Sequence, residues 1–377
     1  MTERPRVSND RLNELRGIGD PLVDALVEQH IVETGESVGR LLGRLFAGPE
    51  LALDHGLVGR YWRSLPESPI EEPGKVVQGQ GVFDLFGPEV LLTLGSCALP
   101  LAYAAGNGVM VVARARKLKD DPIRRLCDTA QMVINVMQPQ GLVPGGIGWR
   151  SIRKVRLIHA LVRLHVQSDP EHPWQSEWGT PINQEDLAGT LLAFSVGVLE
   201  CLRRLGAWVS ADDRNAYVHA WRQIGRQLGV CEELLVQTVD EGLELALQIG
   251  TRQIRPTEEG RGLSNHLLDA VGSLFPLPGY AASLCHFFLQ DSPFGKDVAN
   301  VLGVPKPNWT RWLVSARAAQ KRVVLRWLEV VPEAKRRRSF VARHFTQAAL
   351  RLKHPDGRSP FAVPPTLARS WGLSERL

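Results

Sequence analysis

Apolar residues recur along this 377-residue chain at helical spacing, and alternating runs typical of strands are almost absent. The clearest helix is predicted over residues 147–166, where His159 lies on the apolar side and Arg156 and Arg163 lie along one edge of it. The apolar residues on that side are Ile152, Val155, Val162 and Val166. The pattern therefore predicts a helix that carries one imidazole on its buried side, beside two guanidinium groups.

A second helix is predicted directly before it. Asp120 and Asp121 precede Pro122, which is typical of a helix start, and the helical pattern continues to Val136. Residues 139–148 contain four glycines and form a short loop between the two helices. Helices joined by so short a loop usually lie antiparallel and in contact.

The rest of the chain is predicted to be helical as well. Residues 83–105 read as a buried helix kinked by glycine and proline, and Asn183 and Asp186 read as the capped start of an apolar helix over residues 187–205. Further helices are predicted over residues 232–248, 263–275, 280–289 and 309–331. We expect an all-α fold with one large multi-helix domain over residues 17–333, an N-terminal extension (1–16) and a basic, proline-containing C-terminal segment (334–377) that packs on the core.

The amino-acid composition argues against several classes of protein. Hydrophobic residues make up 44% and charged residues 23%, as in ordinary soluble proteins. The net charge of +5 comes largely from the last third, with its densest run over residues 335–338. No aromatic interleaving or recognition motif accompanies this run, so nucleic-acid binding is not indicated. The five cysteines are widely spaced without a C-x-x-C pair, which argues against a disulfide framework or a cysteine zinc site.

The ends and the apolar stretches predict a cytoplasmic protein. The first ten residues are polar and lack the apolar region of a secretory signal. The most apolar stretches, residues 90–105 and 187–199, are shorter than the roughly 20 residues that span a bilayer. We expect no transmembrane segment, and the basic C-terminal segment leaves peripheral contact with a membrane open.

His159 has two interpretations from its helix alone. It can be a core histidine satisfied by a hydrogen bond, or a metal ligand. A haem suits the surroundings better than bare zinc, because its macrocycle needs an apolar wall and its propionates need cations at one rim. The helix before it also has two interpretations. Arg125, Asp128 and Thr129 share one side, either as a surface ion pair or as polar groups that hydrogen-bond bound dioxygen.

Four ordered segments of the chain resemble a known family. They are RRLCDTA (124–130), IRKVRLIHALVR (152–163), TPINQEDLAGTLLAFS (180–195) and YVHAWRQIGRQLGV (217–230). Together they are similar to the haem-dependent oxygenases that include latex clearing proteins and the MpaB-type enzymes, and the likeness covers roughly residues 17–230. In that family an arginine is followed by a threonine four residues later, and the axial haem histidine follows after thirty more. Here Arg125, Thr129 and His159 have that spacing.

The resemblance implies that haem b lies inside the domain, between the two helices. His159 would be the proximal iron ligand, and Arg125 and Thr129 the distal polar residues. Arg156 and Arg163 as partners of the haem propionates are our own inference from the helical pattern. Members of the family use dioxygen to cleave isoprenoid double bonds oxidatively.

Two departures bear on the mechanism. The rubber-cleaving members carry a lysine directly before the threonine, where this chain has Asp128. They also carry a glutamate base upstream of the distal arginine, whereas residues 90–124 contain no glutamate here. Asp128 is a candidate for that role. These departures and the polar N-terminus argue against rubber as the substrate.

The sequence therefore predicts a haem b-dependent oxygenase that uses dioxygen to oxidise or cleave an unsaturated, isoprenoid or prenyl-like small molecule. We expect its apolar pocket to be lined from residues 187–199 and 280–289. Two alternatives stay open: a haem protein that senses gas or handles peroxide, and a haem-free helical protein that binds an apolar ligand. The substrate, the number of oxygen atoms transferred, the electron donor and the choice between monomer and homodimer are left undetermined.

Overall fold

The computed structural model describes residues 7–47, 56–65, 69–114, 122–275, 277–295, 297–330 and 338–342. Within these ranges the chain is helical, and its only β pairings are isolated bridges between Ala105 and Ile254 and between Ser292 and Gly295. The predicted all-α class is therefore confirmed. The elements in chain order are α1 (Asn9–Arg16), α2 (Pro21–Thr34), α3 (Val38–Ala47), α4 (Gly56–Ser64), α5 (Pro73–Thr93), η1 (Leu94–Ala98), α6 (Leu99–Ala104), α7 (Val109–Arg114), α8 (Pro122–Met137), α9 (Ile147–Gln167), η3 (Ser176–Trp178), α10 (Gln184–Phe194), α11 (Val196–Arg204), α12 (Ala211–Gln227), η4 (Glu232–Leu234), α13 (Val239–Gln253), α14 (Glu258–Gly272), α15 (Tyr280–Leu289), α16 (Val298–Val301) and α17 (Thr310–Val330).

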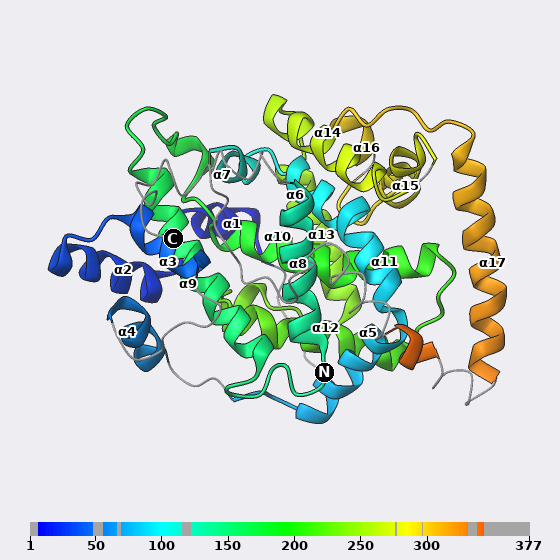
Figure 1. The fold of residues 1–377 in the computed structure, drawn as a ribbon, viewed down its shortest axis with the longest axis horizontal. Helices are drawn as coiled ribbons and strands as arrows, with labels where there is room; N and C mark the ends of the chain where they lie inside the picture. Colours follow the sequence, from blue (N-terminus) through cyan, green and yellow to red (C-terminus); the bar gives the residue numbers. More distant parts are fainter. Residues whose placement is uncertain are drawn as a thin grey trace.

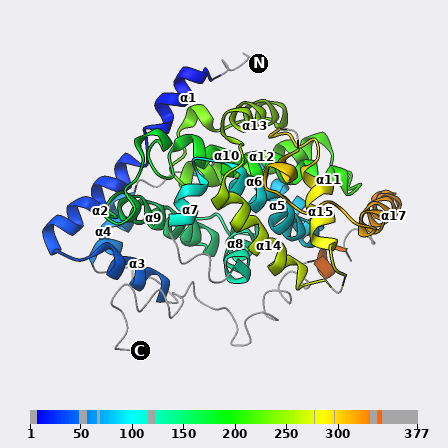
Figure 2. The same ribbon diagram turned by 90° about the horizontal axis from the view of Figure 1, so that it is seen from above.

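The helices pack around a large core and a smaller one. The large core takes side chains from α1 and from the helices between α5 and α17, and the smaller core lies among α2, α3, α4 and α9. Helix α9 joins the two, because Ile152 belongs to the large core while Leu157 and Leu161 belong to the smaller one. Two perpendicular views place α2, α3 and α4 at one end of the molecule and α17 at the other (Figures 1 and 2). Helix α9 is thus held between two packed regions.

The predicted buried, kinked helix is confirmed and extends further than expected. Helical structure runs from Pro73 to Ala104, with non-helical dihedral angles at Phe86, just before Pro88, and a π-helical turn at η1. This helical region is longer than the apolar stretch expected over residues 90–105, and by length and composition alone it could cross a bilayer. However, 72% of its most apolar 18-residue stretch is buried inside the protein, as in a core helix.

Two predicted helices are divided. The predicted helix over residues 187–205 has the expected cap at Asn183 but breaks at Ser195, whose φ of −99° and ψ of −89° end α10. At the break, Ser195 Oγ donates to Leu191 O (2.9 Å), and Tyr217 Oη donates to Phe194 O (3.3 Å), so the last carbonyl group of α10 has a partner. The predicted helix over residues 232–248 is divided into a single turn, η4, and α13, with four residues between them.

Most of the expected N-terminal extension is part of the domain. Residues 9–16 form α1, and Leu12 and Leu15 lie in the large core. Arg16 at its end is buried and makes ion pairs of 3.0 Å with both Glu185 and Asp186 on α10. Helix α1 therefore packs as a structural element of the fold.

The turn between α8 and α9 brings the two helices into close backbone contact. A Cβ on Gly148 would lie 2.5 Å from the carbonyl oxygen of Asn135, and one on Gly141 would lie 2.2 Å from the same oxygen. One turn into α9, the Asn135 side chain donates to Ser151 Oγ at 2.9 Å. The predicted antiparallel contact is therefore confirmed, and glycine is needed to form it.

Replacing Gly148 by alanine should destabilise the protein, because the added Cβ would force α8 and α9 apart. We expect a loss of about 2 kcal/mol, in the range of overpacked positions, measured by denaturant unfolding. The matched control is Gly262→Ala in α14, where a Cβ meets no atom within 4 Å. That variant should gain about 0.5 to 1 kcal/mol from helix propensity. Equal effects of the two substitutions would contradict this account of the turn.

Candidate active site

Two arginines fix α9 against the segment that begins α2. Arg156 forms an ion pair with Asp20, with Nε 2.5 Å from Oδ2, and also donates to Gln227 O at 3.2 Å. Two turns later, Arg163 approaches Asp24 at 2.8 Å and donates to Ile182 O at 3.0 Å. These contacts tie α9 to three distant parts of the chain.

Both arginines predicted to meet haem propionates therefore already have carboxylate partners. Arg163 is 2% exposed, and the side chain of Arg156 is largely buried. Burial of charges in this way requires compensation, which Asp20 and Asp24 supply. Their contact with propionates stays a prediction, and the structure gives them a separate role in orienting α9.

His159 occupies the side of α9 that these contacts help to position. Its ring is partly accessible, yet Nδ1 is buried and has no hydrogen-bond partner. Burial, and secondarily the positive charge of Arg163, lower the pKa of His159 to about 4, whereas Asp20 opposes the shift. The imidazole is therefore neutral at pH 7, which is the form that binds metals. A buried polar nitrogen without a partner is unusual, so the residue fits a ligand role better than that of a satisfied core histidine.

The pairing of α8 with α9 places the other predicted site residues, Arg125 and Thr129, close to the level of His159 along the helix axes. Because Asn135 meets Ser151 and the helices are antiparallel, Thr129, six residues before Asn135, lies level with Leu157, six residues after Ser151. His159 is then level with the part of α8 between Arg125 and Thr129. At about 100° per residue, Thr129 and His159 turn to the same side of the helix pair. The structure thus brings the backbone positions of Arg125, Thr129 and His159 together. The side chain of Arg125 lies outside the described residues.

Asp128 differs from Thr129 in its direction. By the same register it faces the contact between α8 and α9, where it acts electrostatically on Lys154. Burial lowers the pKa of Lys154 to about 8, and the negative charge of Asp128 opposes this shift. This lysine was not singled out by the sequence pattern, because a single lysine on a helix is usually solvated. Asp128 is therefore matched by a cation from α9.

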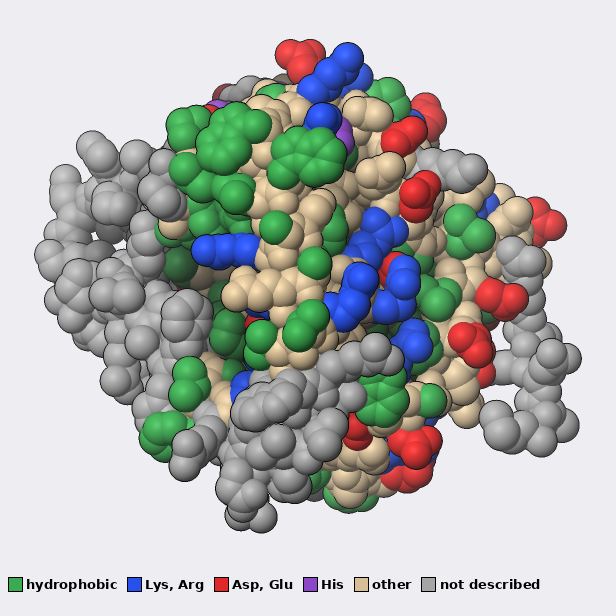
Figure 3. All heavy atoms as spheres, turned by 90° about the vertical axis from the view of Figure 1, so that its right-hand side faces the viewer, with side chains coloured by type: hydrophobic (Ala, Val, Ile, Leu, Met, Phe, Trp, Pro, Cys, Tyr) green, Lys and Arg blue, Asp and Glu red, His purple; other side chains and the backbone are tan. Residues whose placement is uncertain are grey.

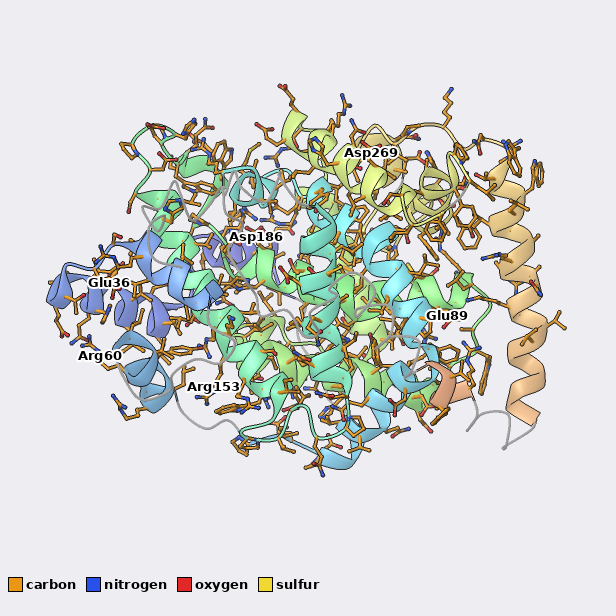
Figure 4. All side chains as sticks on the ribbon, in the orientation of Figure 1. Glu36, Arg60, Glu89, Arg153, Asp186 and Asp269 are labelled. Carbon is orange, nitrogen blue, oxygen red and sulfur yellow. The ribbon has the colours of Figure 1, made fainter. Side chains whose placement is uncertain are left out.

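Glu89 is the nearest glutamate upstream of the region that was expected to lack one. It is 5% exposed and lies 2.5 Å from Lys321 Nζ and 3.1 Å from an Arg338 nitrogen. Figure 4 labels it on α5, on the side of the molecule that carries α17. With its Oε1 committed to two cations, Glu89 acts in the structure as a link between α5, α17 and the C-terminal segment.

A second buried ionic cluster lies between α1, α10 and α13. Glu185 is fully buried and accepts from Arg16 (3.0 Å), Arg252 (2.7 Å) and Gln253 (2.9 Å). Burial raises the pKa of the neighbouring Asp186, also labelled in Figure 4, while Arg16 opposes the shift. The sequence indicated only the capping role of this region. The partners come from residues more than sixty positions away, which no local pattern reveals.

The helices expected to line a substrate pocket lie in the large core. Leu187, Leu191 and Leu192 of α10 and Leu284 and Phe288 of α15 are buried there. A pocket between these helices stays a prediction. The apolar surroundings that such a pocket needs are present.

These features define an all-α protein with a neutral, partly buried histidine level with polar residues of the neighbouring helix. The family model for the catalytic domain of ER-bound oxygenase mpaB/B' and rubber oxygenase matches residues 79–371, and the chain belongs to this family. Rubber oxygenase of Streptomyces sp. (strain K30) is 26% identical over 215 residues, so the match spans about half of each protein, 54% of this chain and 52% of that one. The structure of latex clearing protein LCP in the closed state is similar in fold, with a TM-score of 0.61, 20% identity and coverage of 86% of this chain and 91% of that chain.

The haem-free protein should lose stability as the pH falls from about 6.5 to about 4. In this window the unfolded histidine binds a proton that folded His159 does not, so unfolding is favoured at lower pH. The contribution of this one group should be on the order of 3 kcal/mol at most. Denaturant unfolding of the wild type and of His159→Gln across this pH range isolates the contribution of His159 to the free energy of unfolding. The other groups titrate alike in the two proteins. Parallel stability profiles would contradict the low pKa.

Proposed function

We propose that this chain is a haem b-dependent oxygenase that uses dioxygen to oxidise or cleave an unsaturated, isoprenoid or prenyl-like apolar small molecule. The observation that carries the proposal is His159: a neutral imidazole with an unpartnered buried nitrogen, level with the Arg125 to Thr129 part of α8. Membership of the mpaB and rubber oxygenase family supports it.

In this proposal His159 holds the iron, and the bound haem supplies the dioxygen chemistry. The apolar wall of α9 covers the ligand side, while the Asp20 and Asp24 ion pairs keep α9 from rotating. Thr129 offers a hydroxyl from α8, and Arg125, four residues earlier in the sequence, is the second donor that this proposal assigns. Hydrogen-bond donors held in a dry site stabilise negative charge that develops on oxygen.

Asp128 distinguishes this chain from the rubber-cleaving pattern. A carboxylate cannot replace the amine of a lysine as an iron ligand in the same way, and here it faces the α8 and α9 contact near Lys154. We propose that Asp128, turned toward the contact between α8 and α9 near Lys154, does not block access of dioxygen and substrate to the haem. The role of Asp128 as a base stays a prediction, since its side chain turns in a different direction from those of Thr129 and His159.

Replacing His159 with alanine should abolish haem retention, because it removes the iron ligand. Absorption spectra and pyridine haemochrome assays of protein purified from haem-replete cells measure this. His266→Ala, at an exposed position of α14, is the matched control and should keep full haem. His159→Gly should regain haem when imidazole is added, which separates ligand loss from misfolding. Full haem in His159→Ala would remove His159 from this role.

Replacing Arg125 with alanine or Thr129 with valine should leave haem bound but slow the oxygen chemistry. We expect a decrease of about 100-fold for Arg125→Ala, the effect typical of one lost donor to a developing oxyanion. The readout is the turnover of a prenylated alkene under dioxygen, with haem content as the internal control. Unchanged turnover with full haem would show that the two residues take no part in the reaction.

The two alternative functions give different results in the same assays. A gas-sensing or peroxide-handling haem protein would be coloured but would form no oxidised product from an alkene under dioxygen. A haem-free binding protein would stay colourless after addition of hemin. An aldehyde or ketone product that carries label from ¹⁸O₂ supports the oxygenase.

A further inference from the structure

Helix α17 stands at the edge of the molecule and uses only one side for packing. Thr310, Val314 and Ala318 form its buried side, and Thr310 shares a hydrogen bond of 2.8 Å with Ser283 of α15. Lys321 adds the ion pair to Glu89. Figures 1 and 2 show the helix against the rest of the protein along one flank. The opposite side faces outward.

This outward side is apolar, although the exposed side of a helix in a soluble protein is normally polar. At about 100° per residue, Trp312, Ala316, Ala319 and Val323 lie within about 40° of the direction opposite Val314. Trp309 is 58% exposed, Trp312 66% and Val323 72%. The same spacing continues in the sequence to Trp327. We call the residues Trp309, Trp312, Ala316, Ala319 and Val323 the outward face.

Basic residues flank the outward face on both sides. Arg311 and Arg322 lie between the outward face and the packed side along one flank of the helix, and Arg317 does so along the other. The Arg311 guanidinium also lies 5.0 Å from the centre of the Trp312 ring. From Thr310 to Val330 the sequence has five basic residues and one acidic residue, Glu329. Figure 3 looks onto this side of the molecule and shows hydrophobic and basic side chains next to one another.

We propose that the outward face of α17 docks on an anionic lipid bilayer. Tryptophan prefers the boundary between headgroups and acyl chains, and flanking arginines bind lipid phosphates. The helix would lie in the plane of the membrane, with the packed side still attached to α15 and Glu89. Docking would bring the domain to a surface where apolar molecules concentrate. The proposal rests on α17 alone and does not depend on haem binding.

Charge argues against two other occupants of the outward face. In a two-fold dimer this face would meet itself, which would bring Arg311, Arg317 and Arg322 toward their own copies. The last 35 residues of the chain, 343–377, are also basic, with six arginines or lysines and two acidic residues. An anionic surface complements the positive charge of α17, whereas a second copy of this face and the basic residues 343–377 do not.

The test is sedimentation of the full-length protein with vesicles of phosphatidylcholine, with and without phosphatidylglycerol. Binding should require the anionic lipid and weaken with salt. Val323→Glu should reduce binding by about tenfold or more, because it places a carboxylate at the lipid boundary. Arg317→Gln should reduce it by about fivefold, the effect of one basic residue near an anionic surface.

The matched control is Val32→Glu on α2, at the other end of the molecule, where Val32 is 86% exposed. It should bind like the wild type, and so should His159→Ala, whether or not it carries haem. Absence of vesicle binding would overturn the proposal, as would equal losses in Val323→Glu and Val32→Glu. A dimer in solution that Val323→Glu separates would also overturn it, since the outward face would then be a self-interface.

Discussion

The candidate site depends on the direction in which α9 presents His159. Two sets of contacts determine that direction: the glycine-dependent approach of α8 and α9 at one end, and the ion pairs of Arg156 and Arg163 with Asp20 and Asp24 along the helix. A rotation of α9 by one residue would move the imidazole by about 100° and separate two buried charge pairs. His159 is therefore held by contacts that do not involve the imidazole itself.

This arrangement connects stability with chemistry. The surroundings that bury His159 also lower its pKa, so the residue is kept neutral while one ring nitrogen has no partner. Such a group destabilises the haem-free fold, because a buried polar atom is left unsatisfied. A ligand that used the imidazole would relieve that penalty, and binding of the ligand would then stabilise the protein by mass action. The same residues would thus favour retention of the proposed haem.

Local patterns predicted the parts of the fold that depend on neighbouring residues. The helical class, the Asn183 cap, the turn between α8 and α9 and the position of His159 on its helix all follow from spacing within about twenty residues. The patterns missed the break at Ser195 and the ion pairs of Asp20 with Arg156 and of Glu185 with Arg16 and Arg252. The ion pair of Asp20 with Arg156 joins residues 136 positions apart in the sequence, which no local pattern reveals. The apolar outward face of α17 also required the structure, since helical spacing alone does not tell which side is buried.

The most direct test of the central claim is the resonance Raman spectrum of the purified, reduced protein. Ligation by His159 predicts an iron–imidazole stretching band that shifts when the histidines carry ¹⁵N. The account would be contradicted by a haem-containing protein whose iron mode does not respond to the histidine label, since the iron would then have another ligand. A protein that takes up no haem would indicate that His159 is a core histidine of a helical binding protein.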